Sequence, residues 1–282
     1  MTKKPTVALI YDFDGTLAPG NMQEFGFIQA IGKGIDEFWK DCNSLAEEND
    51  ANQILAFMYK MLEKAKNNRI SLRRESFRKF GSMVKLYPGV TRWFALVNKL
   101  GEELGLEMKH YINSSGLKEM IEGTAIASEF DQLYCSSYLY DVDGIAYWPA
   151  SAVDYTTKTQ FLFKINKGIK EISDTTRINQ YMPEAQRPVP FKRMIYFGDG
   201  MTDIPCMSMI KHNGGHSIAV YGEDAHREMS LKLIREDRVN FVCKADYRKG
   251  QEMYEVIKRI LQKIKADAEF EHLLDIHRQR AE

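Results

Sequence analysis

Short apolar runs recur along the chain and constrain its fold more than any other feature. Most of these runs are continuously apolar rather than alternating, which is typical of parallel strands covered on both faces. They lie at residues 6–11, 108–112, 193–197, 217–221 and 239–243. Helical patterns lie between them, and the clearest ones occupy 93–104 and 251–265. Strands that alternate with helices predict an α/β fold with a doubly wound, mostly parallel sheet.

The segment 17–86 interrupts this alternation. It contains no convincing strand, and its apolar residues, such as Phe57, Met58 and Met61, recur at helical spacing. The sequence therefore predicts a helical insertion directly after the first strand, which closes at the Tyr-Pro-Gly sequence of 87–89. We expect a discontinuous α/β core, formed by residues 1–17 and 86–282, and an inserted helical cap domain, formed by residues 18–85.

Three further segments have recognisable patterns. Residues 138–147 read as a hairpin that turns at 141–144, because Asp-Gly is a strong turn signal. Residues 175–190 are polar, contain three prolines and predict a loop. Residues 266–282 are highly charged and predict a helical tail.

Composition excludes several classes of protein. Lys and Arg total 39, as do Asp and Glu, so no net charge favours binding to nucleic acid or to a membrane surface. No stretch reaches the ~18–20 apolar residues of a membrane helix, and the apolar run near the start is too short for a signal peptide. The four cysteines are widely scattered, which favours buried free thiols and a cytoplasmic location.

Polar side chains follow three of the expected strands. Residues 12–16 (DFDGT) follow the first strand, residues 113–116 (NSSG) follow the second and open a helix, and residues 198–203 (GDGMTD) follow the third parallel strand. In an open parallel sheet, ligands bind beyond the carboxyl ends of the strands. We therefore expect these three segments to converge on one small volume.

The residue types in that volume predict phosphoryl transfer. Clustered carboxylates repel one another unless a cation lies among them, and hard oxygen ligands suit Mg²⁺. Ser114 and Ser115, with backbone N–H groups at a helix start, supply donors to a phosphate, and a lysine adds a compensating charge. A metal, a nucleophilic carboxylate and an anion cradle together describe this chemistry.

With these motifs in this order, the chain resembles the haloacid dehalogenase (HAD) superfamily, and specifically its phosphatase branch. The likeness leans toward the phosphoserine-phosphatase-like subgroup with a helical cap. It covers nearly the whole core, and the combination of DFDGT with a late GDGMTD is highly specific. The resemblance implies a Rossmann-like catalytic core and a cap that closes over the site.

The resemblance also implies roles for individual residues. Asp12 looks like the nucleophile that forms an aspartyl-phosphate, and Asp14 looks like the general acid and base. Asp12, the backbone carbonyl of Asp14, and Asp199 would hold Mg²⁺. Thr16 would brace the loop by hydrogen bonding, and Asp203 would support the lysine or the water shell of the metal.

The phosphate-binding residues are chosen from a few candidates. Lys158, Lys164, Lys167 and Lys170 all lie in the stretch where the family places its lysine. Lys158 is favoured because it begins an amphipathic helix soon after the hairpin. Ser114 matches the phosphate-binding position better than Ser115, which is a neighbouring donor.

The sequence thus predicts a Mg²⁺-dependent phosphatase that hydrolyses a small phosphorylated metabolite through an aspartyl-phosphate. A phosphotransferase or phosphomutase with the same intermediate is one alternative, and a catalytically silent binding module on the same fold is another. Residues 17–21 offer no clear match to the glutamate that phosphoserine phosphatases carry there, so phosphocholine, phosphoethanolamine, nucleotide and sugar phosphates stay open as substrates. Phe25, Trp39 and Tyr59 of the insertion are candidates to face the site.

Overall fold

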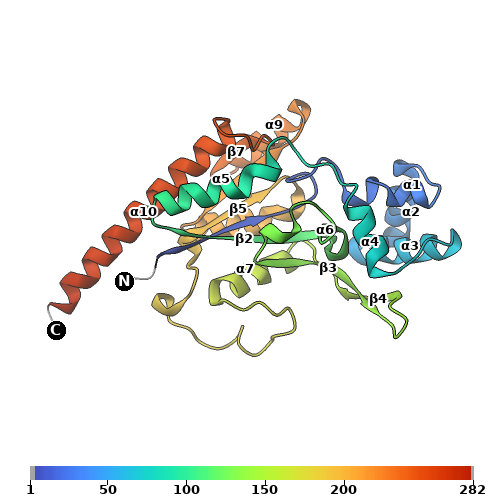
Figure 1. Cartoon of the computed structure of the whole chain (residues 1–282), viewed down its shortest axis with the longest axis horizontal. Coiled ribbons are helices and arrows are strands. Elements are labelled where there is room, and N and C mark those ends of the chain that lie inside the picture. Colours follow the sequence, from blue (N-terminus) through green and yellow to red (C-terminus); the bar gives the residue numbers. More distant parts are fainter. Residues whose placement is uncertain (1–3, 281–282) are drawn as a thin grey trace.

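A seven-stranded sheet with helices on both faces forms the body of the protein (Figure 1), in a computed structural model that describes residues 4–280. The strand order is β4-β3-β2-β1-β5-β6-β7, and only β4 runs antiparallel to its neighbour. The predicted α/β fold is confirmed. The strands are β1 (Thr6–Tyr11), β2 (Glu107–Leu117), β3 (Gln132–Tyr140), β4 (Ala146–Ser151), β5 (Met194–Gly198), β6 (His216–Tyr221) and β7 (Phe241–Lys244).

Strand β1 lies at the centre of the sheet, where it pairs in parallel with β2 and β5. Every one of its residues is buried. Leu9 and Tyr11 belong to the apolar core on one face of the sheet, and Ala8 and Ile10 belong to the core on the other face. Burial on both faces is the reason why the run is continuously apolar rather than alternating.

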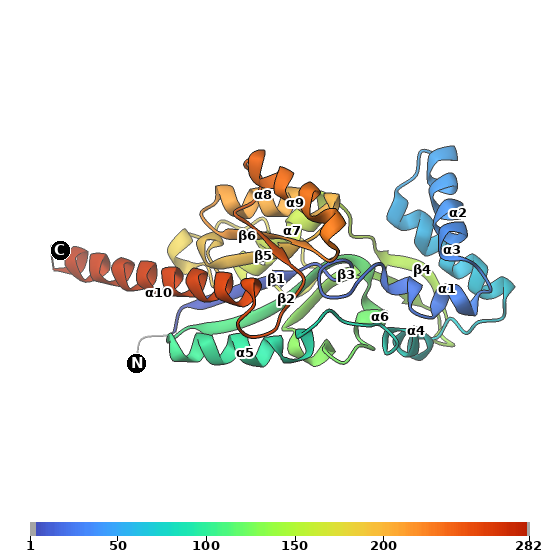
Figure 2. The same ribbon diagram turned by 90° about the horizontal axis from the view of Figure 1, so that it is seen from above.

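Five longer helices cover the two faces of the sheet (Figure 2). Helices α5 (Val90–Glu103) and α10 (Glu252–Gln279) contribute apolar residues to the core that contains Leu9. Helices α7 (Thr157–Lys167), α8 (Ile204–His212) and α9 (Arg227–Arg235) pack on the opposite face. The remaining turns of helix in the body are α6 (Lys118–Ile121) and the 3-10 helices η2 (Ala127–Glu129), η3 (Glu184–Gln186), η4 (Phe191–Arg193), η5 (Met201–Asp203) and η6 (Asp224–His226).

The inserted segment is helical, as predicted, and follows β1 directly. It contains η1 (Met22–Glu24), α1 (Phe27–Ala30), α2 (Ile35–Glu48), α3 (Gln53–Asn67) and α4 (Arg74–Gly81). Helix α2 packs on α3, α3 contacts the outer strand β4, and α4 lies against α6 (Figures 1 and 2). That contact is close, because a Cβ atom at Gly81 would approach the Met120 carbonyl oxygen to 1.8 Å. The domain bounds 1–17, 86–282 and 18–85 stay a prediction.

The sheet differs from the sequence-based prediction in two places. The hairpin at 138–147 is present, but β3 begins earlier, at Gln132, and its first half pairs in parallel with β2. The sequence therefore missed one parallel strand. In addition, β2 runs on to Leu117, with a shift of register after Ser114, so the serines lie at an irregular strand end. The expectation that residues 113–116 open a helix is wrong, because α6 begins only at Lys118.

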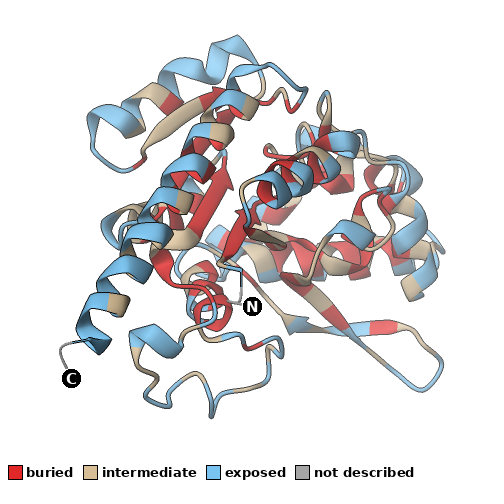
Figure 3. Ribbon diagram, turned by 60° about the vertical axis from the view of Figure 1, so that its left-hand side comes forward, coloured by how far each residue is buried: buried red, intermediate tan, exposed pale blue. Residues whose placement is uncertain are grey.

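The remaining segments follow the predicted pattern. The 141–144 turn is held by Asp141, whose carboxylate accepts hydrogen bonds from the backbone N–H groups of Asp143 and Ile145. The only regular structure within 175–190 is one short 3-10 helix, among residues the structure describes. The predicted tail continues α10, whose far half is largely exposed (Figure 3), and residues 281–282 lie outside the described part.

Two further features bear on the compositional predictions. All four cysteines are buried and free, as the scattered spacing indicates. Between residues 4 and 280, no helix combines the length and apolar character that crossing a bilayer requires.

A buried histidine makes the stability of the fold depend on pH. His110 on β2 is 2% exposed, and its ring nitrogens contact the Tyr11 hydroxyl at 3.2 Å and the Asn98 side-chain oxygen at 2.9 Å. Burial lowers the pKa of His110 from 6.5 to about 4, so below pH 6.5 the unfolded chain binds a proton that the folded chain does not.

We therefore expect the contribution of His110 to the free energy of unfolding to fall by about 2 kcal/mol between pH 7 and pH 5. Urea unfolding of the parent protein and of His110→Gln at both pH values measures this. The glutamine variant should lose less stability on acidification. Equal losses in the two proteins would contradict the assignment.

Candidate active site

The loop after β1 presents the two aspartates of the first motif. Its backbone is fixed by the N–H of Asp12, which donates to the Phe197 carbonyl at 2.9 Å, and by the N–H of Leu17, which donates to the Phe13 carbonyl at 2.9 Å. Gly15 has a positive φ of 71°, and a Cβ atom there would come within 2.0 Å of an Asp199 carboxylate oxygen. Glycine is therefore required both by the turn and by the approach of the second acidic loop.

Three carboxylates from two strand ends meet at one point. Asp12 follows β1, Asp199 and Asp203 follow β5, and one oxygen from each lies within 4.8 Å of the others. The sheet order brings this about because β1 and β5 are adjacent parallel strands. The cluster includes two of the predicted metal ligands, Asp12 and Asp199, together with Asp203. The carboxylate of Asp14 is not part of it.

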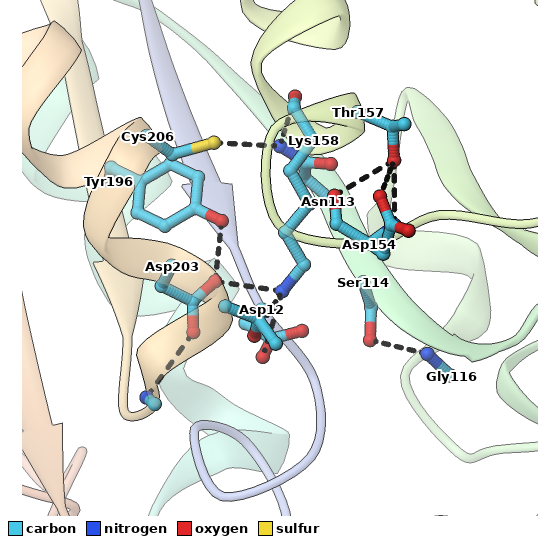
Figure 4. Close-up of polar contacts among 12 residues, drawn as sticks. Asp12, Asn113, Ser114, Gly116, Asp154, Thr157, Lys158, Tyr196, Asp203 and Cys206 are labelled. Carbon is cyan, nitrogen blue, oxygen red and sulfur yellow. Dashed lines mark hydrogen bonds and ion pairs between the residues drawn. The ribbon is translucent and has the colours of Figure 1, made fainter. Parts of the chain in front are cut away.

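Lys158 is the cation of this cluster (Figure 4). It is fully buried near the start of α7, and its Nζ lies 3.2 Å from an Asp12 oxygen and 2.8 Å from an Asp203 oxygen. The Tyr196 hydroxyl donates to the same Asp203 oxygen at 2.7 Å. The side-chain amide of Asn113, within β2, donates to the Lys158 carbonyl at 3.0 Å and so ties the helix to the sheet.

The other lysines that the sequence offered have a different role. The Nζ of Lys164 donates to the carbonyls of Glu171 and Asp174, and the Nζ of Lys167 donates to the carbonyls of Ile178 and Gln180. Both lysines therefore fasten the loop that follows α7. Among these three lysines, Lys158 is the one that contacts the acidic cluster.

Burial and neighbouring charges set the protonation of the site. Burial raises the pKa of Asp12 to about 7, Asp203 adds to this, and Lys158 opposes it. Burial, and then the charge of Asp12, raise the pKa of Asp14 well above its usual value. Although burial disfavours a charged lysine, Asp12 and Asp203 hold the pKa of Lys158 above its usual value. These shifts favour the charged form of Lys158 and the protonated form of Asp14.

Asp14 and the two serines lie around the same opening. One carboxylate oxygen of Asp14 accepts the Met22 backbone N–H at 2.9 Å. Ser114 is buried, and its hydroxyl accepts the Gly116 backbone N–H at 3.1 Å. The buried hydroxyl of Ser115 has no hydrogen-bond partner within the described chain. Asp14 and both serines line one cavity.

Thr16 differs from its expected role. Its side-chain hydroxyl is buried and finds no hydrogen-bond partner among residues 4–280, so it does not brace the loop in the predicted way. The backbone does so instead. The Thr16 N–H donates to the Phe13 carbonyl at 3.3 Å, and the Thr16 carbonyl accepts the Tyr247 hydroxyl at 2.8 Å.

The acidic cluster lies at the edge of a cavity of about 840 Å³ between the insertion and the body. Its walls were mostly missed by sequence reasoning, since no motif marks them. Of the three aromatic candidates in the insertion, Trp39 lines this cavity, and Phe25 lines a separate, shallower hollow. The wall residues beyond the motifs include Gln23, Trp39, Asn43, Gln53, Ile54, Phe57, Glu223, His226, Met229 and Leu233.

The sheet topology and the strand-end carboxylates together describe a doubly wound α/β fold with an acidic site at the carboxyl ends of its central strands. The model of the haloacid dehalogenase-like hydrolases matches residues 9–208, and the chain belongs to that family. This match confirms the resemblance found in the motifs.

Individual proteins resemble the chain in sequence or in structure. An uncharacterized protein of Borreliella burgdorferi is 29% identical over 276 residues, which cover 88% of this chain and 94% of the relative. A probable phosphoserine phosphatase from Vibrio cholerae, in its unliganded form, aligns with a TM-score of 0.58 at 13% identity, over 94% of this chain and 67% of its own. A substrate-bound phosphoserine phosphatase aligns with a TM-score of 0.54 at 14% identity, over 91% and 99%. At these identities the two structures establish a shared fold.

Proposed function

We propose that this chain is a Mg²⁺-dependent phosphatase that hydrolyses a small-molecule phosphomonoester through an aspartyl-phosphate on Asp12. The observation that carries the proposal is the buried arrangement of Lys158 between Asp12 and Asp203, directly behind a cavity wall that contains Asp12 and Asp14. A buried lysine next to a cavity supplies positive charge where a phosphoryl group would gather negative charge. The phosphatases among the structural neighbours support the same class of reaction.

The residues present fit a divalent metal ion. One carboxylate oxygen of Asp12 is buried with no hydrogen-bond partner in the described part of the chain, although it lies in a crowded acidic cluster. Asp12, Asp199 and the backbone carbonyl of Asp14 would hold Mg²⁺, with Asp203 beside them. When bound, Mg²⁺ offsets the negative charge of these carboxylates and of the phosphoryl oxygens.

The side chains of this site can then perform both steps of the reaction, which are formation and hydrolysis of the aspartyl-phosphate. A carboxylate oxygen of Asp12 attacks phosphorus, and the bond from phosphorus to the ester oxygen breaks. Asp14, held protonated by its surroundings, gives its proton to the departing alcohol. The Asp14 carboxylate then takes a proton from a water molecule, whose oxygen attacks phosphorus and releases Asp12 and inorganic phosphate. Lys158, Ser114 and Ser115 donate to the phosphoryl oxygens.

Removal of the metal tests this proposal. Chelation with EDTA should abolish release of inorganic phosphate from p-nitrophenyl phosphate, and added Mg²⁺ should restore it. We expect Asp199→Asn to raise the Mg²⁺ concentration needed for half-maximal activity by about 10- to 100-fold. It should also weaken the Mg²⁺-dependent rise in the temperature of unfolding, which is measured without substrate.

Asp141→Asn is the matched control, because that carboxylate serves only the exposed hairpin turn. It should leave both Mg²⁺ responses at the parental level. Turnover that is insensitive to EDTA in clean protein would contradict the metal assignment.

A further inference from the structure

We infer that the substrate is the phosphate ester of a small alcohol that carries a hydrogen-bond donor, cationic or neutral, and no carboxylate. This inference rests on the proposed function and deepens it, since it concerns the part of the cavity that would receive the leaving group. It follows from the charges, the unpaired polar groups and the apolar surfaces of the cavity wall.

The cavity wall is poor in groups that could pair with a carboxylate, and His226 is its one basic side chain among the described residues. Among residues 4–280, neither lysine nor arginine lines it, and the acidic groups that do are Asp12, Asp14, Asp199 and Glu223. Lys158 lies behind the wall, fully buried and paired with Asp12 and Asp203. A carboxylate on the leaving group would therefore lose hydration without gaining a lysine or arginine as an ionic partner, and Glu223 would repel it.

Gln23 adds an uncharged polar side chain to the cavity wall. It follows Met22, whose backbone N–H holds Asp14, the proposed donor of a proton to the leaving oxygen. Gln23 is 1% exposed and lines the cavity, yet its side-chain oxygen has no hydrogen-bond partner in the described residues. A buried acceptor without a partner destabilises the protein unless a ligand donates to it. An ammonium or hydroxyl group on the leaving alcohol would do so.

The insertion also contributes an aromatic surface to the wall, beside the amide side chains of Asn43 and Gln53. The indole N–H of Trp39 is already engaged, because it donates to Glu24 at 2.9 Å. Trp39 and Phe57 pack edge to face with ring centroids 6.1 Å apart, and both line the cavity. The two aromatic rings offer apolar surface to a short hydrocarbon or an alkylammonium group.

Two substrates that differ by one carboxylate test the inference directly. Phosphoethanolamine and phosphoserine share the phosphate, the ester and the amine, and only phosphoserine carries the acid. We expect kcat/KM for phosphoethanolamine to exceed that for phosphoserine by about 10- to 100-fold, the usual cost of one unmatched polar group in a buried site. Release of inorganic phosphate is measured for both at the same Mg²⁺ concentration.

A charge added to the wall should shift this preference. Asn43 lies on α2, is exposed and lines the cavity outside the catalytic cluster. Asn43→Arg should raise kcat/KM for phosphoserine relative to phosphoethanolamine by about tenfold. Asn43→Gln is the neutral control and should keep the parental ratio.

The possible outcomes separate this inference from the proposed function. A preference for phosphoethanolamine, reduced by Asn43→Arg, supports the inference. Equal or faster hydrolysis of phosphoserine by the parent protein overturns it, while Mg²⁺-dependent hydrolysis of p-nitrophenyl phosphate leaves the proposed function standing. Failure to hydrolyse all three esters overturns the proposed function and the inference together.

Discussion

Asp12→Asn is expected to lower the rate of phosphate release by about 10⁴-fold or more, because the amide cannot form the acyl-phosphate bond. Asparagine has nearly the shape of aspartate, and Lys158 keeps its contact with Asp203 at 2.8 Å. The fold should therefore persist while the chemistry is lost. Steady-state rates with p-nitrophenyl phosphate, together with circular dichroism and thermal unfolding, measure the two effects separately.

Two comparisons make this result specific. Asp141→Asn removes a carboxylate from the exposed hairpin turn and should keep the parental rate. A second preparation of Asp12→Asn, purified independently, excludes a contaminating phosphatase as the source of residual activity. An Asp12→Asn protein that matches the parent protein in rate would show that Asp12 is not the nucleophile.

Lys158→Met is expected to damage both stability and activity. The side chain is fully buried between Asp12 and Asp203, so its removal leaves two carboxylates close together without their cation. Breaking a buried ion pair in this way costs about 3–5 kcal/mol. Urea unfolding without metal should show that loss. Phosphate release should also fall to near background, because the positive charge that would stabilise the phosphoryl oxygens is lost with the lysine.

A paired substitution distinguishes electrostatics from packing. Lys158→Met combined with Asp203→Asn removes one of the two repelling carboxylates and should recover part of the lost stability without restoring activity. Lys164→Met provides the control on the same helix, since Lys164 contacts only loop carbonyls. It should leave the rate close to that of the parent protein. No recovery in the double variant would contradict the role assigned to the charges.

Much of the fold, and the acidic residues of the candidate site, could be predicted from the sequence, because burial leaves a strong local pattern. The strand at 6–11 is buried on both faces, so its continuous apolar run located it to the residue. Glycine at position 15 is forced by the approach of Asp199. Such requirements make the DFDGT and GDGMTD segments recognisable, and adjacent parallel strands then bring Asp12 and Asp199 together.

Other parts could not be predicted, since long-range packing decides them. Strand β3 was missed in its first half, where the buried Ser136 and the half-buried Gln132 weaken the apolar pattern. Lys158 was favoured from its place at a helix start, but its contacts with Asp12 and Asp203 are long-range and are not encoded in local spacing. The cavity wall, including Gln23, comes from the way the insertion folds back toward the body.

Direct detection of phosphate on Asp12 would test the central claim most sharply. The parent protein is mixed with substrate and Mg²⁺, quenched in acid within the first turnovers, digested, and analysed by mass spectrometry. The account predicts an acid-stable, hydroxylamine-labile phosphoryl group on the peptide that contains Asp12, and none in Asp12→Asn. Rapid turnover with phosphate trapped on another residue, while Asp12 stays unmodified, would contradict it.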